Sequence, residues 1–163
     1  MSSEPARVRL SLLDRLVDEA PRQPDAHPQT WGGSAEAFRE SFLRDLEWLL
    51  NTRRVPDPVP ELYPEATRSV YYYGLPDVTS LSADAPEAHA RLAREIEECI
   101  RIFEPRLSSA RVLVAPAERS RERRVRFVID GVLRMDPHTE RVLLDTVLET
   151  PTGKFSVAGD AHA

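Results

Sequence analysis

Acidic side chains are the first candidates for chemistry in this chain, because hydrolysis of a glycosidic bond needs two carboxylates that flank a cleft. Two groups of glutamates recur at helical spacing: Glu36, Glu40, Glu47, Glu95, Glu97 and Glu98. Spacing of this kind is typical of the solvent-facing side of an ordinary amphipathic helix. The glutamates therefore do not indicate a catalytic pair.

The other candidate chemistries are weak. Asp136, Pro137 and His138 have the composition of an ordinary turn, and Cys99 falls on the apolar side of a predicted helix, as a small core residue would. One cysteine and four scattered histidines provide no spacing for a structural zinc site. The sequence has no Gly-rich phosphate loop, G-x-S-x-G elbow or H-E-x-x-H helix. We expect no enzymatic activity, no metal and no cofactor.

Composition favours a soluble protein with one main domain. The chain has 163 residues, the size of a typical single domain. It has no run of about 20 apolar residues that could span a membrane. The start, MSSEPARVRL, carries charges where a secretory signal needs an apolar stretch. We expect a cytoplasmic protein without membrane insertion.

Arginine supplies nearly all the positive charge, with 21 arginines and only Lys154 as lysine. Guanidinium groups suit bidentate contacts with carboxylates and are enriched at protein interfaces. The net charge of −5 argues against nucleic-acid binding. The basic run ERSRERRVRF (118–127) joins two predicted strands and is predicted to be a long solvated hairpin loop; docking on an acidic protein surface is its alternative.

Residues 1–33 are predicted to form an arm and linker. Leu12, Leu13 and Leu16 recur at helical spacing before Pro21, and a segment rich in proline and glycine follows. This short amphipathic segment has no core of its own, so it must bury its leucines elsewhere. The sequence leaves open whether it docks on its own domain or on another protein.

Two longer helices are predicted in residues 34–158, which we expect to form a single α+β domain. The first follows Ser34 as N-cap and runs to about Arg53. The second begins after Asp84, with Glu87 completing a capping box, and ends at Phe103. Between them, three consecutive tyrosines (71–73) cannot all point into the core, so at least one must meet solvent or a polar partner.

After Arg106 the apolar period changes from 3.6 to 2, which predicts strands over 111–115, 124–135, 141–150 and 153–158. Gly131 is a candidate β-bulge, and residues 136–139 a turn. Two main helices packed on a three- to four-stranded antiparallel sheet, with a helical arm, give an α+β fold. The strands at 111–115 and 153–158 could pair with another chain if they lie at sheet edges. Residues 159–163 read as a polar tail.

The stretch IRIFEPRL (100–107) places Glu104 and Arg106 around Pro105, where the second helix must end. Pro105 disfavours helix for Glu104, and in an extended loop the two charges lie on one side by period 2. One interpretation is a helix stop with two solvated charges. The other is a rigid loop that presents both charges to a partner.

Four motifs resemble the TssE subunits of type VI secretion baseplates, which belong to the phage contractile-tail baseplate wedge family historically labelled "lysozyme-like". They are LLDRL (12–16), RDLEWLLNTRR (44–54), SVYYYGLPD (69–77) and IRIFEPRLSSARV (100–112). The strand pair RVRFVIDGVL and RVLLDTVLE follows in the family's order. The resemblance covers about residues 10–158, and the loop AERSRERR has no counterpart that we can match.

The resemblance implies a non-catalytic assembly component in a cytoplasmic complex docked at the inner membrane. Its partners would be the wedge proteins TssF, TssG and TssK and the sheath proteins TssB and TssC, whose assembly the baseplate starts. The family's Glu-Pro-Arg motif, which is associated in the family with contacts to the helical core bundle of the wedge, maps onto Glu104, Pro105 and Arg106. We expect Arg106→Ala to leave the isolated protein folded but to weaken wedge assembly.

The arm is the second predicted protein-binding segment, through its residues Leu12, Leu13, Arg15 and Leu16. Two alternative functions differ in class: a free-standing protein-binding adaptor of the same fold, which would not need the arm, and a peptidoglycan hydrolase. The absence of a carboxylate pair in a cleft-like context argues against the hydrolase.

Overall fold

The computed structural model describes residues 8, 10–16, 31–58, 61–79, 85–116, 124–136 and 138–159. Residues 17–30, the loop residues 117–123 and the tail from residue 160 onward lie outside this part. The elements in chain order are α1 (Leu12–Leu16), α2 (Trp31–Asn51), the 3₁₀ helices η1 (Pro64–Arg68) and η2 (Val70–Tyr72), α3 (Pro86–Phe103), β1 (Leu107–Val114), β2 (Arg124–Met135), β3 (His138–Glu149) and β4 (Lys154–Gly159).

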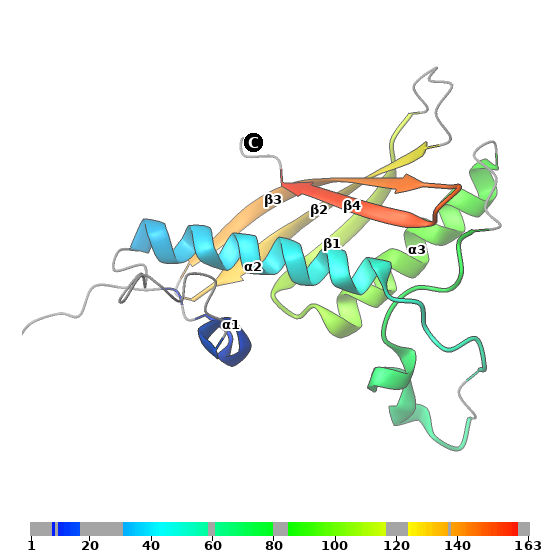
Figure 1. Cartoon of the computed structure of the whole chain (residues 1–163), viewed down its shortest axis with the longest axis horizontal. Coiled ribbons are helices and arrows are strands. Elements are labelled where there is room, and N and C mark those ends of the chain that lie inside the picture. The colour runs from blue at the N-terminus through cyan, green and yellow to red at the C-terminus, as the bar shows by residue number, and fades with distance from the viewer. Residues whose placement is uncertain are drawn as a thin grey trace, which may run out of the picture.

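The four strands form one antiparallel meander in the order β1-β2-β3-β4, so β1 and β4 are its edges. Helix α3 packs against β1 and helix α2 against β4 (Figure 1). The predicted α+β class, with two main helices, a helical arm and four strands, is confirmed.

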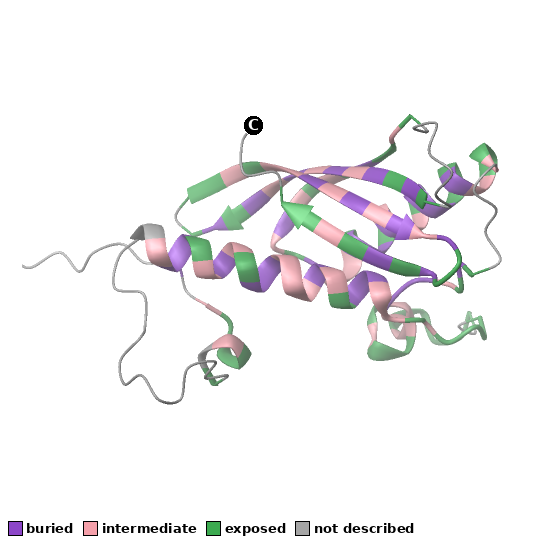
Figure 2. Ribbon diagram, turned by 45° about the horizontal axis from the view of Figure 1, so that its top comes forward, coloured by how far each residue is buried: buried purple, intermediate pink, exposed green. Residues whose placement is uncertain are grey.

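The core lies between the helices and one face of the sheet. Along β2, buried and more exposed residues alternate, as Figure 2 shows for the strands generally. The buried positions agree with the apolar period of the sequence: Val125, Phe127, Ile129, Leu133 and Met135. Helix α2 contributes Phe42, Leu46 and Leu50, and α3 contributes Ile96 and Ile100, all almost fully buried.

The bulge predicted at Gly131 lies on the partner strand instead. Gly131 stays in regular register with Val142, whereas β1 changes register between Ser108 and Arg111, directly across from it. Ser109 has a φ of 55°, which allows the one extra residue of β1 to be accommodated. A Cβ at position 131 would lie 2.8 Å from Cδ1 of Leu107, so any larger residue there would force the Leu107 side chain to shift.

Both helix starts differ from the prediction. Helix α2 begins at Trp31, three residues before Ser34; the Ser34 hydroxyl instead accepts a hydrogen bond from the Val8 amide at 3.2 Å. Helix α3 has Ala85 as its N-cap and proline at its start, without a side-chain cap. The predicted cap Asp84 lies outside the described residues. Gly32 and Gly33 are therefore tolerated in the first turn of α2 rather than preceding it.

Strands β1 and β3 begin earlier than predicted, at residues that pair with β2. Strand β2 has the predicted bounds, but β1 begins at Leu107 and β3 at His138. Their extra residues pair with the C-terminal half of β2, and apolar alternation alone does not reveal these backbone hydrogen bonds. The turn between β2 and β3 is correspondingly tight.

The connection between α2 and α3 carries η1 and η2, which project from the end of α2 (Figure 1). Its three tyrosines point to different surroundings, as predicted. Tyr73 packs edge-to-face on Phe103, with ring centroids 5.2 Å apart, and Arg54 lies over the ring of Tyr72. Tyr71 is exposed. In the described part of the chain, we find no helix with the length and apolarity to cross a bilayer.

A candidate protein-docking site

The corner between α3 and β1 is built by Glu104, Pro105 and Arg106. Helix α3 ends at Phe103, as the proline predicts, and the Glu104 amide donates the last helical bond to the Ile100 carbonyl at 2.8 Å. The Leu107 amide then donates to the Glu104 carbonyl at 3.1 Å. The chain thus passes directly from helix into strand through one tight turn.

Glu104 and Arg106 do lie on one side of this turn, but their side chains pair with each other. Nε of Arg106 donates to Oε1 of Glu104 and Nη2 donates to Oε2, each at 2.6 Å. Glu104 is only 4% exposed, so its carboxylate depends on this bidentate partner. Arg106 also donates to Oδ2 of Asp45 on α2 at 2.9 Å.

The pKa of Arg106 reflects this setting. Burial alone would lower the pKa of the guanidinium, but the hydrogen bonds and charges of Glu104 and Asp45 outweigh burial and raise it above its ordinary value. The guanidinium also lies over Phe38 and Phe42, 5.8 and 5.6 Å from the ring centroids. Arg106 therefore braces the α3–β1 corner against α2. We therefore expect Arg106→Ala to lower the stability of the isolated protein as well as to weaken wedge assembly.

The ion pairs continue from Asp45 to the arm. Nη2 of Arg44 lies 3.1 Å from Oδ1 of Asp45 and also bonds to Asp14 of α1. The Asp14 side chain is 7% exposed and accepts a further hydrogen bond from Ser41 Oγ at 2.8 Å. We call the chain Asp14–Arg44–Asp45–Arg106–Glu104 the ion-pair network. It connects the arm, α2 and the Glu-Pro-Arg corner.

Asp14 has a strongly perturbed acidity. Burial would raise the pKa of its carboxyl, but hydrogen bonds from Ser11, Arg44 and Ser41 prevail and lower it to about 2. The carboxylate is therefore charged at neutral pH and fixes α1 on the surface of α2.

The leucines of α1 face away from the domain that anchors it. Leu12, Leu13 and Leu16 are 75%, 58% and 81% exposed. The arm thus docks on its own domain through the buried Val8, the partly buried Leu10 and the polar contacts of Asp14. The leucines of α1 itself stay unpartnered among the described residues. The side chain of Arg15 lies outside the described part. On α2, Trp48 is 56% exposed, and Arg44 lies over its ring at 5.2 Å.

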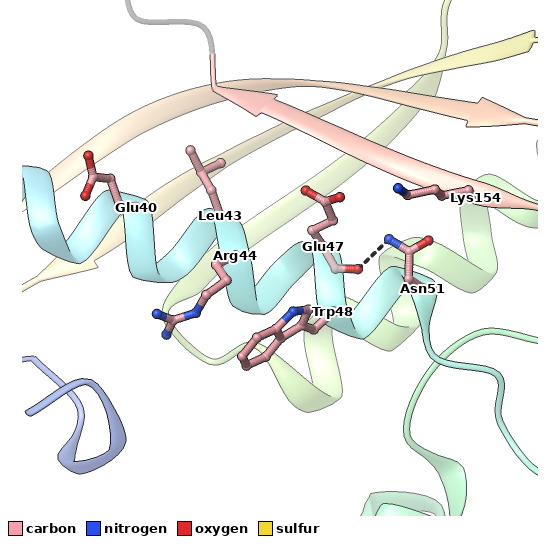
Figure 3. Close-up of a pocket in the computed structure, with 7 residues that line it drawn as sticks. All are labelled: Glu40, Leu43, Arg44, Glu47, Trp48, Asn51 and Lys154. Carbon is pink, nitrogen blue, oxygen red and sulfur yellow. Dashed lines mark hydrogen bonds between the residues drawn. The ribbon is translucent and has the colours of Figure 1, made fainter. Parts of the chain in front are cut away.

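Two hollows lie near these elements. A groove of about 780 Å³ runs between α2 and the edge strand β4, lined by Glu40, Leu43, Arg44, Glu47, Trp48, Asn51 and Lys154 (Figure 3). A second hollow of about 570 Å³ lies beside the corner, lined by Pro105, Arg106, Arg134, Asp136, His138 and Thr139. The first is open and contains two carboxylates, Glu40 and Glu47, two helical turns apart on α2.

The residues that sequence suggested for chemistry have structural explanations. The Cys99 thiol is buried and donates to the Gly74 carbonyl at 3.4 Å, and burial raises its pKa to about 11. Glu95, Glu97 and Glu98 pair with arginines. Within the described residues, no three Asp, Glu, His or Cys side chains are grouped as metal ligands.

The structure brings the two predicted docking segments into one network through residues that sequence reasoning missed. Arg44 and Asp45 begin the motif RDLEWLLNTRR (44–54), which nothing in the sequence connects with the arm or the corner. Adjacent residues do not face each other on a helix, so their charges do not predict a pair. Their partners come from outside α2, and sequence spacing does not reveal them.

An α+β domain that holds an apolar arm outward and braces a charged corner has the features of a protein-docking component. The chain belongs to the baseplate wedge protein gp25 family, whose sequence model matches residues 36–138, more than half of the chain. The resemblance drawn from the motifs is thereby confirmed. Proteins of this family are structural components of the baseplate in contractile injection systems. No curated protein and no solved structure gives a significant match.

The matched range runs from the first turns of α2 to the start of β3. It includes Asp45 and the Glu-Pro-Arg corner, and it leaves out α1 and β4.

Proposed function

We propose that the chain is the wedge subunit that joins TssF, TssG and TssK in the baseplate of a type VI secretion machine and helps to start the TssB–TssC sheath. It would act in the cytoplasm, within a complex docked at the inner membrane. It would contribute no catalytic step. Family membership supports the structural baseplate role. The residues of the chain support a particular docking surface.

The ion-pair network carries this proposal. It anchors α1 through Asp14, so the exposed leucines are held at a fixed place on the body instead of being free to collapse onto the core. Preorganised apolar side chains favour binding because little conformational freedom remains to be lost. Burial of one such leucine contributes about 1.5–3 kcal/mol.

The Glu-Pro-Arg corner would be the second contact. Pro105 is exposed at the apex of the turn, beside the hollow that contains Arg134 and Asp136. The pairing of Glu104 with Arg106 makes this turn rigid. The corner would then present its backbone and Pro105 in one conformation, with Arg106 acting mainly as the brace beneath.

Co-purification tests the proposal. The tagged chain is co-expressed with TssF, TssG and TssK of the same secretion system, as parent and as the double variant Leu12→Ser, Leu16→Ser. Exposed leucines contribute little to the stability of the fold, so the double variant should stay folded. The amount of wedge proteins that co-purify with it should be at least about tenfold lower than with the parent.

Val70→Ser is the matched control, because Val70 is also an exposed apolar residue but lies on η2. It should retain the wedge proteins like the parent. Failure of the parent to co-purify, or full retention by the double variant, would overturn the proposal. Deletion of residues 1–20 distinguishes the baseplate role from the alternative function. A free-standing adaptor of the same fold would still bind its partner without these residues.

A further inference from the structure

The free edge of β4 is blocked at one position by a side chain from α2. Oδ1 of Asn51 accepts a hydrogen bond from the Phe155 amide at 2.9 Å, and Nδ2 donates to the Phe155 carbonyl at 2.9 Å. Nδ2 also donates to the Glu47 carbonyl at 2.9 Å, which ties the side chain to its own helix (Figure 3). Asn51 therefore satisfies both edge groups of Phe155, as a residue of a neighbouring strand would.

The register of β4 shows which of its groups face outward. Phe155 lies opposite Leu148, and its N–H and C=O are used by Asn51, so they point away from β3. In an antiparallel ladder the outward direction recurs at every second residue. The N–H and C=O groups of Val157 and Gly159 therefore also face the free edge, and within the described part of the chain no side chain forms a hydrogen bond with them.

The opposite edge carries a similar feature. Oε2 of Glu97, on α3, accepts a hydrogen bond from the Val112 amide of β1 at 3.2 Å. The register change between Ser108 and Arg111 distorts the same edge. Proteins commonly protect sheet edges in this way, since an open edge of alternating apolar residues can pair with another chain.

We propose that Asn51 is an edge cap, which excludes a second copy of this chain from β4 at Phe155 and confines strand addition on this edge to Val157–Gly159. A second copy is the occupant to exclude because β4 has alternating apolar residues, no proline and Lys154 as its only charge. Two copies of such a strand could pair edge to edge. The cap concerns the isolated chain and does not depend on the proposed baseplate role.

Hydrogen exchange and sedimentation of the isolated protein test the cap. In Asn51→Leu the Phe155 amide loses its acceptor, so its exchange should be at least about tenfold faster. Self-association should appear with a dissociation constant at least about tenfold lower than that of the parent. Circular dichroism verifies the fold, and Asn51→Ser, whose side chain is too short to reach Phe155, serves if the leucine variant fails to fold.

Glu40→Gln is the matched control, because Glu40 lines the same groove on α2. It should leave the Phe155 exchange rate and the association state unchanged. An unchanged exchange rate at Phe155, or unchanged self-association, in a folded Asn51 variant would overturn the proposal. Neither readout involves TssF, TssG or TssK, so this outcome is independent of the co-purification experiment.

Discussion

Arg106 bonds to two carboxylates, and its role in the isolated protein follows from the burial of one of them, Glu104. Glu104 is nearly inaccessible to water, and a buried carboxylate without a partner is strongly destabilising. The guanidinium itself is 23% exposed, which screens part of the interaction. The residue therefore contributes to stability and to the shape of the corner at the same time.

Arg106→Ala should lower the free energy of unfolding by roughly 2–4 kcal/mol, because it leaves Glu104 buried without its bidentate partner. Arg106→Lys keeps the charge but not the planar fork and should lose less. Urea unfolding followed by circular dichroism measures both. Arg101→Ala removes an exposed pair with Glu98 and should cost no more than about 1 kcal/mol. An Arg106→Ala protein with parental stability would contradict the bracing role.

The sequence indicated that Glu104, Pro105 and Arg106 form a special corner but not which groups they contact. The proline fixed the end of α3, and period 2 placed both charges on one side. Their mutual pairing and the bond to Asp45, which lies 61 residues away from Arg106, depend on tertiary packing. Local spacing carries no information on such a distant contact.

At the scale of elements, α1 contacts the domain through the Asp14 carboxylate, and Val8 and Leu10 pack against the core just before the helix begins. The pKa of Asp14 is about 2 on the domain, below the ordinary value of 3.8. A group with a lowered pKa contributes stability that is complete above the ordinary value and is lost as the pH falls through the lowered one. The contribution of Asp14 to the attachment of α1 should therefore be complete above about pH 4 and lost towards pH 2.

Asp14→Asn should weaken the attachment of α1 already at neutral pH, since the amide cannot replace the charge that bonds Arg44. The expected cost is about 1 kcal/mol after allowance for solvent screening. Amide exchange of residues 12–16 measures the release. Asp77→Asn removes another carboxylate with a lowered pKa, one that bonds Thr79, and should leave α1 attached. Parental protection of α1 in Asp14→Asn would rule out this anchor.

Elements with strong local signals were predicted well, and their boundaries less so. Strand β2 has both alternation and a following turn, and its bounds agree with the sequence. The start of α2 was misplaced because Gly32 and Gly33 indicated a loop, whereas the helix includes them. The sequence suggested a bulge at Gly131 because a glycine inside a strand pattern often marks one. The bulge lies on β1, and only the register between the two strands reveals this.

At the scale of the whole molecule, the ion-pair network joins elements that otherwise pack on different parts of the sheet. Helix α2 covers β4 and α3 covers β1, and the network links α1, α2 and the end of α3. The two predicted docking segments are therefore parts of one rigid unit. A partner that contacts both would meet surfaces whose relative positions are already set.

Photo-crosslinking in cells that assemble the secretion machine tests this docking surface most directly. A photoreactive amino acid replaces Leu16 on the arm, Pro105 at the corner or, as a control, Val70 on η2. All three are exposed and lie outside the ion-pair network. We predict crosslinks to wedge subunits from Leu16 and Pro105 and none from Val70. Absence of wedge crosslinks from both Leu16 and Pro105 in assembled baseplates would contradict the account.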